Sequence, residues 1–263
     1  MRVTFLGTGS AMPTGERFQT GLLLESGSQN LLLDCGSGVL HGLQRTSVGY
    51  EGIDAVLLTH HHVDHVSDLV PLLKARWLSG ETELLIAGPE GTEGLVTDLL
   101  DVHDYLEGRL ELTFQHVEPG SVSLAGFDVT AMPVRHSMYC LAYRFEPAAE
   151  GADSAGDASD GDPPAFVFSG DTEAFPELIE FADGAAVLAH DCSFPDAVDV
   201  DNHPTPSELG RALADADADV GRVYLTHLYP HTDGRHEAMA ESIGDHYDGD
   251  VRFASDGLSL DIN

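Results

Sequence analysis

The feature that most constrains the fold is the stretch Ala55–Leu69, in which a short apolar run leads directly into a cluster of histidines. Residues Ala55–Leu58 have no polar face, which predicts a strand covered on both sides. Apolar residues then recur at helical spacing, at Val66, Leu69, Val70 and Leu73. The stretch therefore predicts a strand, a turn and a helix, with the histidines in the turn.

Four histidines and an aspartate lie within six positions of this turn: His60, His61, His62, Asp64 and His65. One alternative is that these histidines lie on a solvated loop, as isolated histidines usually do. That alternative does not explain why so many cluster directly after a buried strand. Imidazole nitrogens and carboxylate oxygens are the ligands that cations such as zinc prefer. The turn therefore predicts a metal site.

Composition favours a folded protein in a reducing compartment. The 263 residues fit one large domain or two small ones, and 42% of them are hydrophobic. No apolar run is long enough to span a membrane, and the apolar start of the chain is too short for a signal peptide, so we expect a cytoplasmic protein. Three scattered cysteines, Cys35, Cys140 and Cys192, indicate reduced thiols.

The charge is extreme. Asp and Glu total 45 against 12 Lys and Arg, which gives a formal net charge of −33. Such a surface repels itself in dilute buffer, and in 1 M salt the Debye length falls to about 3 Å and removes most of that repulsion. The composition therefore suggests adaptation to a high-salt cytoplasm, as in halophilic archaea.

Several other apolar strands also finish in a potential ligand. The residues found at or just beyond strand ends are His60, His136, Asp171, Asp191 and His227. Because the carboxyl ends of strands converge on one edge in layered α/β folds, these side chains can meet in space. The order of the strands suggests two similar halves, each giving one sheet with helices outside.

Two flanking segments adjoin this edge. Glycine at Gly7 and Gly9 allows close backbone approach, whereas the spacing is wrong for a phosphate-binding loop. Asp34 follows a strand and either supports the histidines or caps a helix. The acidic, low-complexity segment 147–164 predicts a solvated loop between two strands.

The motifs in combination resemble the metallo-β-lactamase superfamily. They are THHHVDH at Thr59–His65, RHS around His136, SGDT around Asp171 and THLYP around His227. The resemblance covers essentially the whole chain. It implies an α/β fold of the four-layer αββα sandwich type, with residues 1–263 forming a single hydrolase domain and a two-metal site at one edge of the paired sheets.

The resemblance also implies a ligand set for two divalent ions, first of all Zn²⁺, with Mn²⁺ or Fe as alternatives. One ion would be held by His60, His62 and His136. The other would be held by Asp64, His65 and His227, and Asp171 would bridge the two. His61 is expected to face away from the metals.

Within the superfamily the chain looks most like the ribonuclease Z and phosphodiesterase branch. The opening FLGTGSAMPTGER and the segment LLLDCGSG resemble that branch, and His190–Phe194 resembles its His-Glu-Ala-Thr-Phe motif. His203 with Thr205 resembles its His-x-Thr motif, which carries a histidine near the scissile phosphate. This implies that Asp64 orients the nucleophile, that His203 stabilises the phosphate or protonates the leaving group, and that Asp191 fixes the His203 tautomer. The alternative for His203 is a surface histidine at a helix edge.

Two departures bear on the substrate. Asp191 stands where glutamate is usual, so its carboxylate is expected to reach less far toward His203. Segment 147–164 lies where ribonuclease Z carries an arm that grips transfer RNA, and it has no Lys, Arg or aromatic residue for nucleic-acid binding. Transfer RNA maturation is therefore less favoured as the function.

The leading prediction is a binuclear hydrolase that cleaves a small phosphodiester or nucleotide, with RNA as a further substrate class, by a metal-bridging hydroxide. The alternatives are ribonuclease Z activity, or hydrolysis of a lactone, thioester or sulfate ester at the same site. A metal-binding scaffold without activity is disfavoured, because a decayed site should have lost ligands. By analogy with this branch, a homodimer is also considered.

Overall fold

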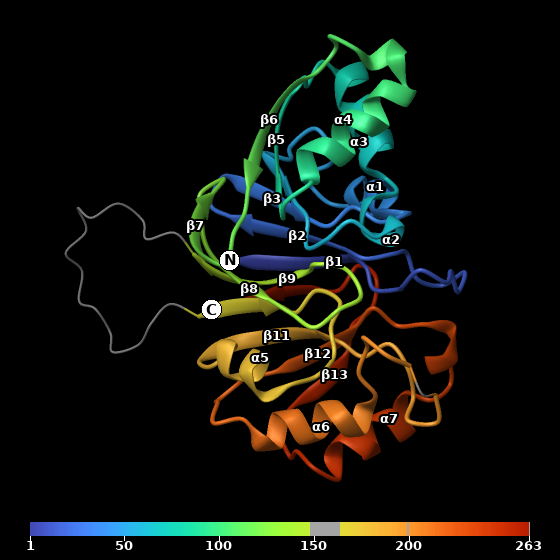
Figure 1. The fold of residues 1–263 in the computed structure, drawn as a ribbon, viewed down its shortest axis with the longest axis vertical. Helices are drawn as coiled ribbons and strands as arrows, with labels where there is room; N and C mark the ends of the chain where they lie inside the picture. The colour runs from blue at the N-terminus through green and yellow to red at the C-terminus, as the bar shows by residue number, and fades with distance from the viewer. Residues whose placement is uncertain (148–163, 199, 263) are drawn as a thin grey trace, which may run out of the picture.

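The structure, a computed structural model, describes residues 1–147, 164–198 and 200–262. Most of the predicted acidic loop 147–164 thus lies outside the described residues. Two seven-stranded sheets lie face to face, with helices on both outer sides (Figure 1). This arrangement confirms the predicted four-layer αββα sandwich.

The first sheet has the strand order β14-β1-β2-β3-β4-β5-β6. Its β2–β3 hairpin and the parallel strands β3 to β6 follow the chain in order. The strands are β1 (Arg2–Gly7), β2 (Gly21–Ser26), β3 (Gln29–Leu33), β4 (Ala55–Leu57), β5 (Glu83–Gly88), β6 (Glu111–His116) and β14 (Ser259–Asp261).

The second sheet mirrors this layout, with the order β13-β12-β11-β10-β9-β8-β7. Antiparallel strands β7 to β10 are followed by the parallel strands β10 to β13. The strands are β7 (Gly120–Leu124), β8 (Phe127–Pro133), β9 (Leu141–Pro147), β10 (Ala165–Phe168), β11 (Ala185–Asp191), β12 (Val223–Thr226) and β13 (Val251–Phe253).

Helices cover the outer face of each sheet (Figure 1). Those beside the first sheet are α1 (Val39–Leu43), α2 (Val63–Val66), α3 (Leu69–Ser79), α4 (Thr92–Val102) and η1 (Asp104–Leu106). Those beside the second sheet are α5 (Pro176–Phe181), α6 (Pro206–Asp215), η2 (Pro230–Thr232) and α7 (His236–Gly244). Helix α6 begins with a capping box between Thr205 and Glu208, which satisfies free amides of its first turn.

The apolar runs of the strands are explained by burial on both faces. In β2, Leu22 and Leu24 pack into the core between the sheets. Leu23, which points the other way, packs into the core between the first sheet and its helices. A third core lies between the second sheet and its helices, around Leu188 and Leu225.

Two strand ends determine where Asp171 and Asp191 lie. Strand β10 ends at Phe168, so Asp171 lies in the following turn, where Gly170 has φ 61°. Strand β11 continues to Asp191 itself. The physical reason is pairing with β12, which brings Asp191 opposite Thr226.

No helix in the part of the chain that the structure describes has both the length and the apolar character needed to cross a membrane.

Candidate metal centre

The histidine turn is held in place by Asp34, at the end of the neighbouring strand β3. The two Asp34 oxygens accept hydrogen bonds from the Thr59 amide at 2.8 Å and the Thr59 hydroxyl at 2.8 Å. Asp34 Oδ2 also lies 2.7 Å from His65 Nδ1, so His65 donates from Nδ1 and turns Nε2 toward the other ligands. Of the two roles left open for Asp34, the structure favours support of the histidines.

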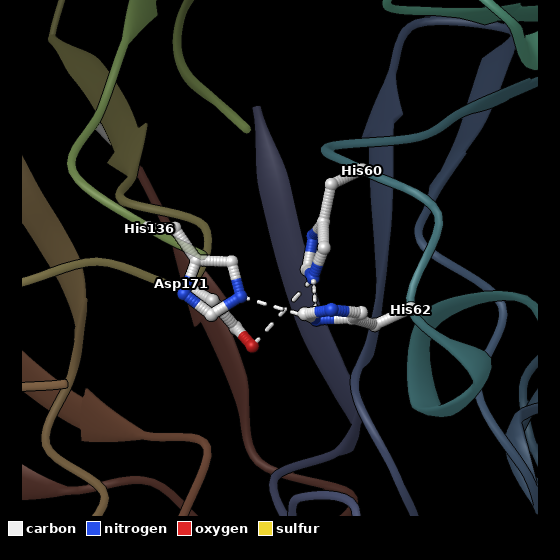
Figure 2. A group of neighbouring side chains, drawn as sticks. All are labelled: His60, His62, His136 and Asp171. Carbon is white, nitrogen blue, oxygen red and sulfur yellow. Dashed lines mark hydrogen bonds and ion pairs between the residues drawn. The ribbon is translucent and has the colours of Figure 1, made fainter. Parts of the chain in front are cut away.

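The first group of potential ligands is His60, His62, His136 and Asp171, shown in Figure 2. Each contributes one ligand atom, and these atoms lie within 4.8 Å of one another. His62 Nδ1 is 3.1 Å from both His60 Nε2 and His136 Nε2. The group joins the two halves, because His136 follows β8 of the second sheet and His60 follows β4 of the first.

The second group is Asp64, His65, Asp171 and His227, with ligand atoms at the same close spacing. His227 Nε2 lies 3.1 Å from Asp64 Oδ2 and 3.1 Å from Asp171 Oδ2. Asp171 Oδ1 lies 3.2 Å from His65 Nε2. Asp171 therefore belongs to both groups, and the structure brings together all seven residues expected to bind metal.

Two buried atoms without hydrogen-bond partners in the described part of the chain indicate that the cluster fits divalent ions. His65 Nε2 and Asp171 Oδ1 are buried, and neither has a hydrogen-bond partner among the described residues. Burying such atoms without a partner costs free energy, and a cation between them would remove that cost. The mixed imidazole and carboxylate donor set suits zinc and similar ions.

The electrostatics of the cluster keep its ligands available. Burial would raise the pKa of Asp171, but the charges of His227 and His65 outweigh it and hold the pKa well below its usual value. Burial, assisted by His65, lowers the pKa of His60 well below its usual value. Asp171 is thus an anion and His60 a neutral imidazole, the forms that bind metal.

Asp191 and His203 form a pair beside the cluster. Asp191 Oδ2 lies 2.7 Å from His203 Nδ1. The expectation that aspartate would reach less far was wrong, because β11 extends to Asp191 and the following loop brings His203 close. Burial lowers the pKa of His203, but Asp191, by charge and hydrogen bond, raises it to about 9. His203 is therefore protonated at neutral pH.

Ser193 was missed by the sequence reasoning. Its Oγ donates to Asp191 Oδ1 at 2.6 Å and lies 3.0 Å from His227 Nδ1, which can donate to it. Ser193 Oγ is also 3.3 Å from His203 Nδ1. It therefore joins a potential metal ligand to the Asp191–His203 pair. The signal was present, since Ser193 occupies the threonine position of the motif that assigned Asp191.

Aromatic side chains next to His203 were also missed. Tyr229, in the THLYP segment, lies with its ring centroid 6.0 Å from that of His203, and Phe194 lies 6.1 Å from it. Burial and the nearby carboxylates, Asp64 foremost, raise the pKa of Tyr229 above its usual value. Only His227 of the THLYP segment was predicted as a site residue, although Tyr229 follows it by two positions.

Two further histidines are outside both ligand groups. His61 Nε2 is 2.8 Å from Thr92 Oγ1 at the start of α4, in agreement with the prediction that it faces away. His190 is fully buried, and its Nδ1 donates to the carbonyl oxygen of Asp191 at 2.6 Å.

The close backbone approach predicted at Gly7 is present. A Cβ atom there would lie 1.8 Å from the Gln19 carbonyl oxygen, which no side chain allows. Gly36 has the same role beside the site, since a Cβ atom would lie 2.1 Å from the Asp64 carbonyl oxygen.

Comparison with known proteins agrees with this geometry. A family model described as Anti-Pycsar protein Apyc1 matches residues 1–232. Ribonuclease Z of Haloferax volcanii is 29% identical, covering 100% of this chain and 95% of the relative. Ribonuclease Z of Mycolicibacterium paratuberculosis is 32% identical, covering 88% of this chain and 86% of the relative.

Solved structures show the same fold. The metallo-β-lactamase fold protein YhfI from Bacillus subtilis superposes with a TM-score of 0.79 at 26% identity, covering 99% of both chains. The short form of human tRNase Z has a TM-score of 0.72 at 21% identity over 100% of both chains, which bears on the fold alone. The chain therefore belongs to the metallo-β-lactamase superfamily, as a ribonuclease Z-like metal-dependent hydrolase of the family described as Anti-Pycsar protein Apyc1.

Proposed function

We propose that this protein hydrolyses a phosphodiester bond in a small nucleotide, with two divalent ions, first of all Zn²⁺, in its strand-end cluster. The observation that carries the proposal is that Asp171 belongs to two ligand groups at once, while the Asp191–His203 pair lies beside them. Shared carboxylates of this kind hold two cations close together in phosphodiesterases.

The ions, when bound, would supply an activated water and a clamp on the attacking and leaving oxygens. Asp64 lies at the edge of the cluster with Oδ2 near His227, where it can orient the water. His203, protonated and held by Asp191 at Nδ1, presents its other nitrogen as a donor to a phosphate oxygen or to the leaving group.

Two arginines, Arg17 and Arg135, are engaged within the protein and do not support a long polynucleotide substrate. Arg17 donates to the Thr8 hydroxyl and the Ala254 carbonyl. Arg135 lies over the Phe175 ring at 4.1 Å and pairs with Glu177. Side chains engaged in this way do not line a groove for a phosphate backbone, which is the main determinant of nucleic-acid affinity.

Cleavage of precursor transfer RNA is the second candidate, because the relatives named ribonuclease Z align over the whole chain. That alignment spans 305 positions against 263 residues here, so the relative carries residues that this chain lacks. The shorter chain favours the smaller substrate.

A substrate screen in molar KCl with Zn²⁺ or Mn²⁺ tests the proposal. We expect turnover of bis(p-nitrophenyl) phosphate and of cyclic nucleotides, and none of a lactone. Efficient cleavage of precursor transfer RNA alone would favour the second candidate, and turnover of the lactone alone would refute both. Metal analysis should give about two ions per chain, and a single ion would refute the binuclear arrangement.

We also propose that the enzyme works in a high-salt cytoplasm and that it is a homodimer. The net charge of −33 supports the salt adaptation. We expect the melting temperature to rise as KCl increases toward molar concentration, because screening removes repulsion between carboxylates. A maximum in dilute buffer would contradict this, and sedimentation in the same buffers measures the oligomeric state.

A further inference from the structure

Three aromatic side chains lie together beside the metal centre, and we call Phe194, Tyr229 and His231 the aromatic platform. Phe194 and Tyr229 are stacked, with ring centroids 4.4 Å apart and planes 28° apart. His231 lies 5.3 Å from Phe194 and 6.4 Å from Tyr229. Offset stacking at these distances stabilises the arrangement of the rings.

The platform is built on the same two strand ends as the catalytic groups. Phe194 follows β11, which carries Asp191, and Tyr229 follows β12 and His227. The Tyr229 amide donates to the Ser193 carbonyl at 3.3 Å. The Tyr229 ring lies 5.7 Å from His227 and 6.0 Å from His203, nearly edge-on to both. The platform thus lies beside the position where the scissile phosphate would sit.

The exposure of the platform increases outward from the core. Phe194 is only 6% exposed, Tyr229 is half-buried and His231 is exposed. The fully buried Tyr143, by contrast, donates from its hydroxyl to the Leu58 carbonyl at 2.9 Å. A tyrosine that serves only core packing is usually buried with its hydroxyl paired. Phe194 therefore acts as a support, and Tyr229 remains available for a ligand.

The electrostatics of the chain indicate what such a ligand is. With 12 basic against 45 acidic residues, basic side chains are few and contribute little to affinity for a nucleotide. Stacking of a base on an aromatic ring contributes about 1–3 kcal/mol and does not depend on charge. It also persists in salt concentrations that weaken contacts to phosphate.

We propose that Tyr229, supported by Phe194, forms the subsite for a nucleobase joined through its sugar to the scissile phosphate. This inference rests on the proposed phosphodiesterase function and names the side chain that recognises the base of its nucleotide substrate. It makes Tyr229 a residue for substrate binding, distinct from the metal ligands and from His203.

Two esters with the same leaving group test the subsite: thymidine 5′-(p-nitrophenyl phosphate) and methyl p-nitrophenyl phosphate. We expect Tyr229→Leu to raise KM for the thymidine ester about tenfold, equivalent to loss of one stacked base. The rate on the methyl ester should stay within about twofold, because that ester has no base. Tyr229→Phe should restore the lower KM for the thymidine ester relative to Tyr229→Leu, since it keeps the ring.

Tyr105→Leu is the matched control, because Tyr105 is exposed on η1 and contacts Lys74. Equal losses on both esters in Tyr229→Leu would overturn the subsite, since the side chain would then act on the reaction and not on the base. Melting curves of all variants establish that they fold.

Failure of the phosphodiesterase proposal is recognised separately, as absence of turnover of either ester by the unchanged enzyme. Calorimetry on the metal-loaded protein then decides the subsite alone. Thymidine 5′-phosphate should bind more tightly than deoxyribose 5-phosphate, and Tyr229→Leu should remove the difference. Equal binding of the two phosphates by the unchanged protein would overturn the inference.

Discussion

The two halves of the molecule contribute to the metal centre in different ways. The first half gives four potential ligands from one short segment: His60 and His62 in the turn after β4, and Asp64 and His65 in helix α2. The second half gives His136, Asp171 and His227, each from the end of a different strand. The first set is placed by local backbone geometry, whereas the second depends on the correct order of the strands in the sheet.

The supports of the two sets differ as well. The Asp34 side chain anchors the turn of the first half through Thr59 and His65. In the second half, Asp191 and Ser193 contact His227 and also His203. We infer that the first half mainly binds metal, while the second half couples metal binding to proton donation.

The largest effect is expected at the residue that both halves share. Asp171→Ala should abolish hydrolysis and reduce bound metal below one ion per chain, because both ligand groups lose a member. His60→Ala should spare the group formed by Asp64, His65 and His227. Measuring the number of ions bound per chain in the two variants compares the loss of the shared residue with the loss of a residue from one group. Two retained ions in Asp171→Ala would show that Asp171 is not shared.

A smaller effect is expected at the support of the first half. Asp34→Asn keeps a side chain that tolerates the left-handed backbone but removes the charge that orients His65. Affinity for the ion near His65 should fall about 10–100-fold, the usual effect of losing a partner of a ligating histidine. Competition with a zinc chelator measures this. Unchanged affinity would assign Asp34 a role in folding alone.

Loss of the Ser193 hydroxyl, which supports the second half, should lower activity by an amount that depends on the leaving group of the substrate. Ser193→Ala removes the contacts to Asp191 and His227, and Ser193→Thr keeps the hydroxyl. We expect Ser193→Ala to lower kcat more for alkyl than for p-nitrophenyl leaving groups, because only the alkyl group needs a proton in the transition state. Chelator competition should also detect weaker metal binding. Equal losses on both leaving groups would separate Ser193 from proton donation.

The smallest and most gradual effect is that of pH. The pKa of His203 is raised to about 9 in the folded protein, above the value near 6.5 of an unfolded histidine. The ion pair therefore stabilises the fold fully below pH 6.5, and this contribution is lost as pH rises through 9. The melting temperature of the metal-free protein should fall across this interval. Asp191→Asn should remove this dependence, and an unchanged profile in that variant would exclude His203 as its source.

The sequence was sufficient wherever a property is local. The strand and the helical character of residues 63–79 follow from hydrophobic spacing, although the structure divides that segment into the two helices α2 and α3. Asp34 could be located but not assigned, because its partner His65 is 31 positions away. The ligands of the second half could be located at strand ends, but their assignment to one ion or the other needed the family resemblance.

The remaining elements depend on distant contacts. Strand β14 has three residues and exists through its pairing with β1, more than 250 positions earlier. Helix α7 buries only Met239 and Ile243, too few apolar residues for a clear helical period. Ser193 and Tyr229 were overlooked because their importance comes from the rings and carboxylates around them.

Two backbone conformations at the metal centre lower the stability of the fold but position residues that activity needs. Asp34 and His227 both have left-handed conformations, with φ of 58° and 56°, which cost most residues other than glycine about 1–2 kcal/mol, and aspartate less. Glycine would adopt these conformations without strain but would supply neither support nor ligand. Selection of variants for thermal stability without metal would therefore favour loss of the active centre, so any engineering of this protein must select for stability with the ions bound.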